Sequence, residues 1–168
     1  MFSNTIHQIW LGQRPFPEPA VKWRAAYPDH MPGWECKLWR DRDIPALAEN
    51  ALCPDLMLDV SMGAGLRSDV IRYEILRQHG GIYLDHDMEI LRPLDEIIMT
   101  DCVHFGLQFE EFRSVGNAVL ASPRQDIRSG SFYSEESVRW SGHPDLRMFG
   151  RCWISPARRR WPWLLMLG

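Results

Sequence analysis

Two carboxylates one residue apart, Asp85 and Asp87, are the most distinctive chemical feature of this sequence. They follow a short apolar run that opens on a glycine pair, and the run predicts a β-strand that continues through both aspartates. Because side chains alternate across a strand, Asp85 and Asp87 are expected on one face and His86 on the other. Carboxylate oxygens are ligands that Mg²⁺ and Mn²⁺ prefer, and two of them leave room for water and phosphate oxygens. The pattern therefore indicates a metal site for a phosphate-bearing substrate.

The spacing alone does not identify such a site, because Asp41 and Asp43 repeat it. This second pair follows Trp39 and precedes Pro45, an arrangement typical of a turn that leaves a strand. Its carboxylates are expected to be solvated or to cap the residues that follow. The metal interpretation therefore applies to the later pair.

A helix is predicted over residues 65–79, and the glycines at 80–81 supply its C-cap. Apolar residues lie on two sides of this helix, which predicts that it is largely buried. Ser68, Asp69 and Arg72 form a polar strip between the two apolar sides. An ion pair between Asp69 and Arg72 at i, i+3 spacing is the ordinary explanation. On a helix enclosed by apolar residues, however, the strip is better explained as the wall of a cleft.

The remaining elements mix strands and short helices. Strands are predicted at residues 5–11, 34–39, 82–91, 102–109 and 115–121, and short helices at 20–27, 44–51 and 54–60. Pro28 is expected to end the first of these helices. The opening order of strand, helix and strand is typical of an α/β nucleotide-binding layer.

Composition limits the class of protein. A chain of 168 residues suits one domain, and 45% hydrophobic with 24% charged residues is ordinary for a soluble globular protein. A net charge of −3 gives no indication of nucleic-acid binding. The four cysteines form neither a zinc-binding nor a compact disulfide pattern, which favours a reduced, cytoplasmic setting. No signal peptide or transmembrane segment is predicted, so any association with the inner face of the membrane would be peripheral.

Charge and pattern both change near residue 124. Residues 1–123 carry 11 basic and 18 acidic side chains, whereas residues 124–168 carry 8 basic side chains, all arginine, and 4 acidic ones. The later segment also lacks clear helical or strand periodicity. We therefore expect one folded domain at 1–123 and an atypical segment at 124–168 that is disordered, truncated or frame-shifted.

Three motifs follow one another in the chain: IHQIW at residues 6–10, SDxxRY at 68–73 and GGIYLDxD at 80–87. With them, residues 5–95 closely resemble the glycosyltransferases with a DXD sugar-binding region, glycosyltransferase family 32. That family includes fungal initiating mannosyltransferases and bacterial capsule and lipopolysaccharide transferases. The resemblance implies that residues 1–123 form a donor-binding domain with an α/β fold of the GT-A type, in which helices flank a Rossmann-like mixed sheet. Relatives usually continue well beyond this length, so the chain is expected to be truncated at its C-terminus.

The activity implied by the resemblance is metal-dependent hexose transfer with retention of anomeric configuration. The donor would be a UDP- or GDP-sugar, the cofactor Mn²⁺ or Mg²⁺, and the acceptor a glycan or lipid-linked glycan in surface polysaccharide synthesis. The implied catalytic residues are Asp69, Arg72, Asp85 and Asp87. Asp87 matches the direct metal ligand, whereas Asp85 matches an aspartate that contacts donor hydroxyls and reaches the metal through water.

The implied donor-binding residues come from all three motifs and from one later position. Trp10 matches a tryptophan that stacks on the nucleotide base, and Asp69 with Arg72 matches a pair that binds sugar hydroxyls. The full set is Trp10, Ser68, Asp69, Arg72, Tyr83, Asp85 and Asn117.

Two other interpretations stay open. The chain could be a donor-binding remnant without transferase activity, because its last 45 residues depart from the family pattern. It could also be a phosphohydrolase that uses Asp85 and Asp87, since paired aspartates serve that chemistry too. The phosphohydrolase interpretation leaves Trp10, Asp69 and Arg72 unexplained.

Overall fold

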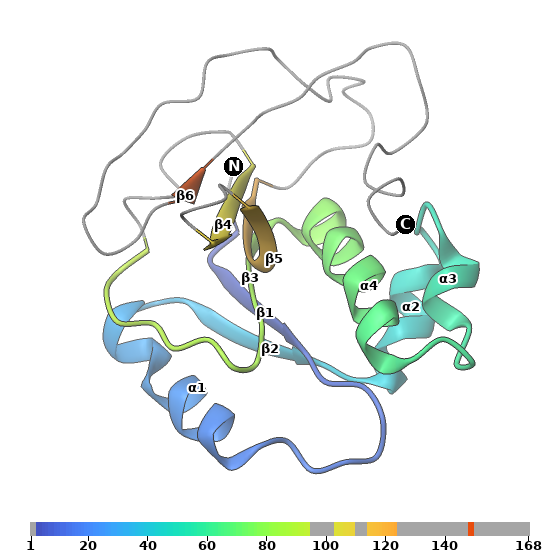
Figure 1. Ribbon diagram of the computed structural model, residues 1–168, viewed down its shortest axis with the longest axis horizontal. Helices are drawn as coiled ribbons and strands as arrows, with labels where there is room; N and C mark the ends of the chain where they lie inside the picture. Colours follow the sequence, from blue (N-terminus) through green and yellow to red (C-terminus); the bar gives the residue numbers. More distant parts are fainter. Residues whose placement is uncertain (1–2, 95–102, 110–113, 124–147, 150–168) are drawn as a thin grey trace.

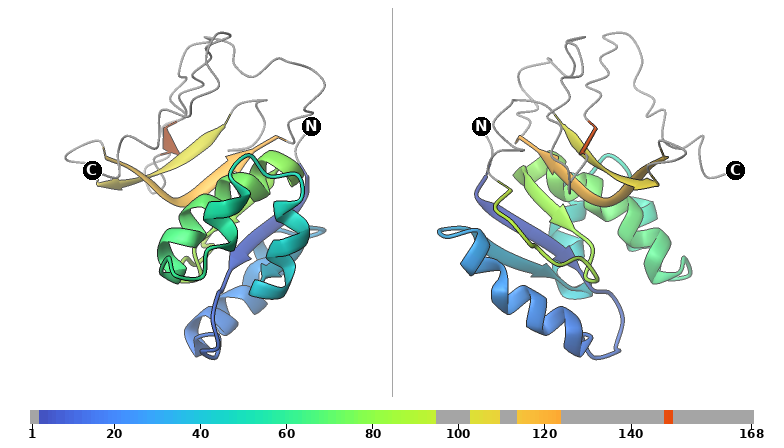
Figure 2. Two further views of the ribbon diagram at one scale, coloured as in Figure 1. Left: turned by 90° about the vertical axis from the view of Figure 1, so that its right-hand side faces the viewer. Right: turned by 60° about the vertical axis from the view of Figure 1, so that its left-hand side comes forward.

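A six-stranded mixed sheet with helices on both faces makes up the computed structural model of the protein (Figures 1 and 2). The structure describes residues 3–94, 103–109, 114–123 and 148–149. The expected atypical segment at 124–168 therefore lies outside the described residues, apart from the short last strand.

The sheet combines a parallel half and an antiparallel half. Its strands are β1 (Thr5–Ile9), β2 (Glu35–Trp39), β3 (Gly81–Leu84), β4 (His104–Phe109), β5 (Ser114–Ser122) and β6 (Met148–Phe149), in the spatial order β2-β1-β3-β5-β4-β6. β1 pairs in parallel with β2 and β3, while β5 runs antiparallel to both β3 and β4. The predicted mixed sheet is thus confirmed.

The helices connect the parallel strands. They are α1 (Glu18–His30), α2 (Ile44–Ala48), α3 (Pro54–Leu58) and α4 (Ala64–His79), with a 3₁₀ turn η1 (Asp41–Asp43) before α2. Of the helices within the described ranges, none combines the length and apolar character that crossing a membrane requires.

The predicted helix over 65–79 is confirmed as α4, and its glycine C-cap is confirmed too, because the Gly80 N–H donates to the Leu76 carbonyl at 2.8 Å. The expectation that Pro28 ends the first helix is wrong. Pro28 lies in the last turn of α1, which continues to His30. In this position proline removes one backbone hydrogen bond, and the helix continues with the remaining ones.

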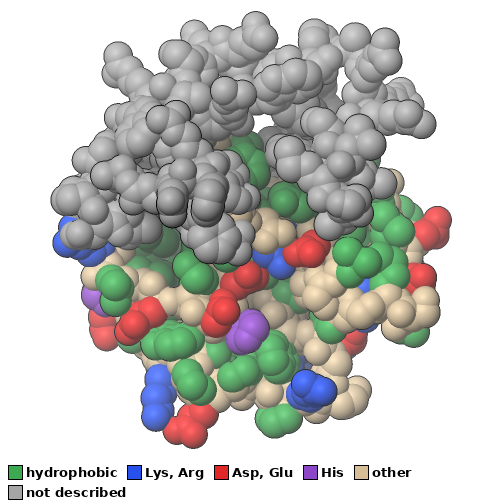
Figure 3. Space-filling view, in the orientation of Figure 1, with side chains coloured by type: hydrophobic (Ala, Val, Ile, Leu, Met, Phe, Trp, Pro, Cys, Tyr) green, Lys and Arg blue, Asp and Glu red, His purple; other side chains and the backbone are tan. Residues whose placement is uncertain are grey.

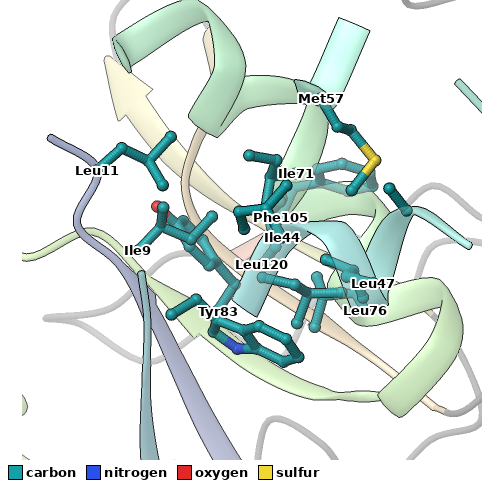
Figure 4. Packing of buried hydrophobic residues seen from close by; sticks show 13 residues of the cluster. Ile9, Leu11, Ile44, Leu47, Met57, Ile71, Leu76, Tyr83, Phe105 and Leu120 are labelled. Atoms are coloured by element: carbon teal, nitrogen blue, oxygen red, sulfur yellow. The ribbon is translucent and has the colours of Figure 1, made fainter. Parts of the chain in front are cut away.

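Each face of the sheet buries its own hydrophobic cluster. On one face, α4, α2 and α3 pack against the sheet through the residues shown in Figure 4, among them Ile9, Ile71 and Leu120. On the other face, α1 packs through Tyr27 and Met31. Burial of these apolar surfaces is the main source of stability for both layers.

His7 links three elements at the centre of the sheet. Its Nδ1 accepts a hydrogen bond from the Trp39 indole at 3.1 Å, and its Nε2 lies 2.9 Å from the Gly80 carbonyl oxygen. Because an indole N–H can only donate, Nδ1 carries no proton and Nε2 donates to Gly80. The imidazole is therefore neutral, in agreement with burial lowering the pKa of His7 to about 4.

Gly81 allows β3 to approach β1 closely. Its φ is +96°, and a Cβ at this position would clash with the backbone oxygen of Thr5 and lie 3.2 Å from the His7 ring. A side chain here would therefore meet both an unfavourable backbone conformation and rigid neighbours.

We expect Gly81→Ala to lower the free energy of unfolding by about 3 kcal/mol or more, because the strained backbone and the clash act together. The matched control is Gly65→Ala in α4, where a Cβ meets open space. That change should stabilise the protein by about 0.5–1 kcal/mol. Urea unfolding of both variants tests this, and equal stabilities for the two would contradict it.

We also expect His7 to make stability fall in mild acid. Between pH 6.5 and pH 4 the unfolded chain binds a proton at this histidine while the folded protein does not, so stability decreases as the pH falls. At and below pH 4 the free energy of unfolding is lower by roughly 3 kcal/mol on this account. When unfolding is measured at several pH values, the free energy of unfolding should fall less steeply with decreasing pH for His7→Gln than for the unsubstituted protein.

Candidate functional site

The predicted site residues meet where two parallel strands end. β1 leads into Trp10 and β3 leads into Asp85, so both reach the same edge of the sheet. Figure 3 shows acidic side chains beside a histidine near the middle of one face. Carboxyl ends of neighbouring parallel strands are a common place for nucleotide binding in α/β folds.

The Asp-x-Asp segment is a turn and not part of a strand. β3 ends at Leu84, the Asp85 N–H donates to the Ala118 carbonyl of β5 at 2.8 Å, and the Met88 N–H donates back to the Asp85 carbonyl at 3.1 Å. The predicted strand over 82–91 is therefore wrong beyond Leu84, and strand alternation does not orient Asp85, His86 and Asp87. The hydrogen bond between Met88 and Asp85 closes a turn that the apolar pattern alone does not indicate.

Arg72 on α4 connects most of the predicted site. Its guanidinium lies 2.8 Å from Asp69 Oδ1 and 3.1 Å from Asp85 Oδ1, and it donates to the Asn117 carbonyl at 2.6 Å and to the Ser68 carbonyl at 3.3 Å. The Arg72 side chain is only 6% exposed, whereas the two carboxylates are 33% and 27% exposed. The guanidinium thus orients both aspartates while their outer oxygens stay within reach of a ligand.

Two neutral side chains complete this network. The Asn117 amide donates to Asp69 Oδ1 at 2.9 Å, and the Tyr83 hydroxyl donates to Asp85 Oδ1 at 2.6 Å. The Tyr83 ring also lies 4.7 Å from the Arg72 guanidinium carbon. Burial raises the pKa of Tyr83 far above its usual range, so the hydroxyl keeps the proton it donates. Tyr83 is 2% exposed, so its hydroxyl supports Asp85 from the interior of the protein.

The two aspartates of the turn differ in their surroundings. Asp85 Oδ1 already accepts hydrogen bonds from Arg72 and Tyr83. Asp87 is exposed and makes no hydrogen bond or ion pair that involves another residue the structure describes. Its carboxylate fits a divalent cation as a direct ligand, and Asp85 fits a supporting role.

A metal at this place would need ligands from elsewhere. Within the described ranges, no group of three or more histidine, cysteine, aspartate or glutamate side chains could hold an ion. Two carboxylates leave several positions of an octahedral shell for water and for the phosphate oxygens of a substrate. This donor set suits an ion that binds together with a diphosphate.

An aromatic group lies next to the turn. The Trp10 ring centre is 4.8 Å from that of His86 and 5.6 Å from that of Phe16, and both contacts are edge-on. The Trp10 indole N–H donates to the Arg14 carbonyl at 2.8 Å, which fixes the ring. Because residues 85–88 form a turn, strand alternation does not decide where His86 points, and its ring lies against Trp10. Sequence reasoning missed His86 and Phe16, and the aromatic type of Phe16 in the loop after the first strand was the available signal.

The second pair of aspartates is structural, as expected. Asp43 accepts a hydrogen bond from the Arg40 N–H at 2.8 Å, and Asp41 accepts one from the Gly12 N–H at 2.6 Å and pairs with Arg67 at 3.1 Å. Although partial burial opposes it, the bonds from Gly12 and Arg67 hold the pKa of Asp41 below its usual value. The expectation that these carboxylates cap the residues that follow is wrong, because Asp43 bonds back to Arg40 and makes no cap hydrogen bond to α2, and Asp41 bonds to Gly12 and Arg67.

The sequence profile of one family matches residues 20–104, which is 85 of the 168 residues. The family is described as the glycosyltransferase sugar-binding region containing DXD motif. The chain belongs to this glycosyltransferase family. The resemblance seen in the three sequence motifs is confirmed.

Several relatives share this region. An uncharacterized glycosyltransferase of Acanthamoeba polyphaga mimivirus is 31% identical over 101 residues, covering 58% of this chain and 40% of the relative. The initiation-specific alpha-1,6-mannosyltransferase of Candida albicans is 29% identical over 104 residues, covering 58% and 27% respectively. Inositol phosphoceramide mannosyltransferase 3 of Schizosaccharomyces pombe is 34% identical over 94 residues, covering 55% and 26%. The similarity therefore spans less than half the length of these relatives.

A solved structure, the PaToxG glycosyltransferase, has the same fold. The TM-score is 0.54 at 14% sequence identity, and the similarity covers 73% of this chain and 56% of that one. The predicted GT-A-like fold class is confirmed.

We expect Arg72→Lys to lower the free energy of unfolding by roughly 2 kcal/mol or more, because one ammonium group cannot replace a planar fork that bonds to four oxygens. The control is Lys22→Ala, which removes an exposed i, i+4 pair with Glu18. That change should cost less than about 0.5 kcal/mol. Chemical unfolding of both variants provides the comparison, and a small loss for Arg72→Lys would contradict the network described above.

Proposed function

We propose that the chain binds a nucleotide-sugar together with Mn²⁺ or Mg²⁺ and transfers the hexose, with retention of anomeric configuration, to a glycan or lipid-linked glycan. Family membership supports glycosyl transfer. The donor, the metal and a role in surface polysaccharide synthesis are parts of the proposal.

One observation carries the proposal: a buried arginine holds Asp69 and Asp85 together beside Trp10 and the exposed Asp87. A nucleotide-sugar has an aromatic base, a charged diphosphate and a sugar rich in hydroxyls. The indole offers the base a stacking surface, and the oriented carboxylates accept hydrogen bonds from hydroxyls. The exposed Asp87 carboxylate adds a place for a cation beside the diphosphate.

Asp87, with Asp85 behind it, would hold the cation. When bound, the cation would neutralise the diphosphate as negative charge develops on the departing nucleotide. Arg72 would hold both Asp69 and Asp85 oriented toward the sugar through its planar guanidinium. Asn117 would limit the rotation of Asp69 through its amide.

The proposed transfer needs no nucleophile from the protein. As the bond between the sugar carbon and the phosphate oxygen breaks, the acceptor oxygen forms a new bond to that carbon on the same face. The acceptor's proton passes to the phosphate oxygen that leaves. The chain would therefore act by positioning and by electrostatic stabilisation.

A reduced, cytoplasmic setting, with the acceptor at the inner face of a membrane, would suit this function. Cys36 and Cys53 are both free thiols within the described residues. Such thiols persist where the compartment is reducing.

Titration with a panel of nucleotide-sugars and Mn²⁺, following binding and nucleotide release, separates this function from its alternatives. Binding with slow hydrolysis of the donor supports a transferase. Binding without turnover on any acceptor indicates an inactive donor-binding protein. Hydrolysis of simple phosphate esters without regard to the sugar indicates a phosphohydrolase.

We expect Asp87→Asn to weaken Mn²⁺-dependent donor binding at least about tenfold, because the amide removes the charge of the direct ligand. Asp43→Asn in the other Asp-x-Asp pair is the matched control and should leave donor binding unchanged. Isothermal titration of donor with and without Mn²⁺ measures both. Full donor affinity in Asp87→Asn would show that the metal assignment is wrong.

A further inference from the structure

The position of Asp87 depends on the backbone of its turn. Its side chain has no partner among the described residues, so no side-chain contact within those residues orients it. Three hydrogen bonds to the backbone of the turn hold it instead. The Asp85 N–H bonds to Ala118, the Met88 N–H bonds to Asp85, and the Met88 carbonyl accepts from the Tyr27 hydroxyl at 2.6 Å.

Tyr27 belongs to α1, on the opposite face of the sheet from α4. Its hydroxyl also accepts a hydrogen bond from the Gln8 amide at 3.2 Å, and the Gln8 carbonyl oxygen accepts one from Arg24 at 3.0 Å. Arg24 in turn donates to the Cys36 carbonyl of β2. This relay of side chains therefore runs from β2 through α1 and β1 to the turn.

The direction of every hydrogen bond in the relay is determined. A guanidinium only donates, so the oxygen of the Gln8 amide must face Arg24 and its NH₂ group must face Tyr27. The Tyr27 hydroxyl accepts that bond and is left with its own proton to donate to Met88. Burial raises the pKa of Tyr27 to about 12, so this proton stays bound.

The relay is also rigid. Gln8 is 0% exposed and Tyr27 is 1% exposed, and Tyr27 packs in the hydrophobic cluster with Met31 and Ile82. A buried hydroxyl in close packing holds its hydrogen-bond partner in one place. A metal ligand on a turn needs such support, because small displacements of a ligand reduce metal affinity.

We propose that Tyr27 is a positioning residue for metal binding: its hydroxyl, oriented by Gln8 and Arg24, holds the Met88 carbonyl and thereby places the Asp87 carboxylate. This inference rests on the proposed function, since it assumes that the turn binds the cation. Tyr27 itself touches neither donor nor metal.

Tyr27→Phe tests the proposal, because it removes one oxygen and keeps the ring that packs in the core. The control is Cys36→Ala, which trims packing in the same cluster while the Cys36 carbonyl still accepts from Arg24. Mn²⁺ is titrated into each protein saturated with UDP or GDP, and free Mn²⁺ is followed by electron paramagnetic resonance. Nucleotide binding is measured separately in EDTA, and hydrogen exchange is followed across residues 85–90.

We expect Tyr27→Phe to bind Mn²⁺ about fivefold more weakly, with nucleotide affinity in EDTA changed less than twofold. Hydrogen exchange across the turn should be faster, and Cys36→Ala should match the unsubstituted protein in Mn²⁺ affinity. Unchanged Mn²⁺ affinity in Tyr27→Phe would overturn the inference, as would an equal loss in Cys36→Ala or an equal loss of nucleotide affinity in EDTA. If the unsubstituted protein binds no Mn²⁺ with either nucleotide, the proposed function fails before the question about Tyr27 arises.

Discussion

The rest of the site depends on one interaction, the contact of the buried Arg72 guanidinium with the oxygen atoms around it. A charge that is 94% removed from solvent is costly unless oxygens surround it. Two carboxylates and two backbone carbonyls meet this need, and they come from α4, from the end of β3 and from β5. Satisfying one charge therefore brings together three segments that are up to 45 residues apart in the chain. The same contacts align Asp69 and Asp85 along one edge of the sheet.

The sheet supports this arrangement through polar groups in its interior. His7 ties β1 to β2 and to the glycine that ends α4, while Gln8 faces the other layer and reaches Tyr27. Neighbouring residues on one strand thus serve opposite faces, as strand alternation requires. The buried polar side chains that these contacts join are all hydrogen-bonded, so they favour this fold over other ways of packing the same elements. Rigid elements on both faces consequently hold a turn that carries the exposed Asp87.

The region that is similar to other glycosyltransferases contains most of these site elements. The family profile covers residues 20–104, and these hold α4, β3 and the turn. Trp10 follows β1, which precedes the matched region, and Asn117 lies on β5, which comes after it. At 14% identity the fold is still shared with a solved glycosyltransferase structure. In this chain the parallel pairing of β1 with β3 brings Trp10 and Asp85 to the same edge of the sheet.

Local pattern was enough to predict the helix before the glycine pair, the α/β class and the i, i+3 pairing of Asp69 with Arg72, because a helical period and a glycine cap depend on neighbours in sequence. The same reasoning failed for residues 85–91, where an apolar run predicted a strand. There the tertiary structure decided, since the hydrogen bond between Met88 and Asp85 closes a turn, bonds to Ala118 and Tyr27 hold it, and the His86 ring lies against Trp10. Likewise, only the folded chain shows that Asp69 and Asp85 share one guanidinium. Such contacts join groups that are distant in sequence. They therefore form, and stabilise this arrangement, only when the helices pack against the sheet.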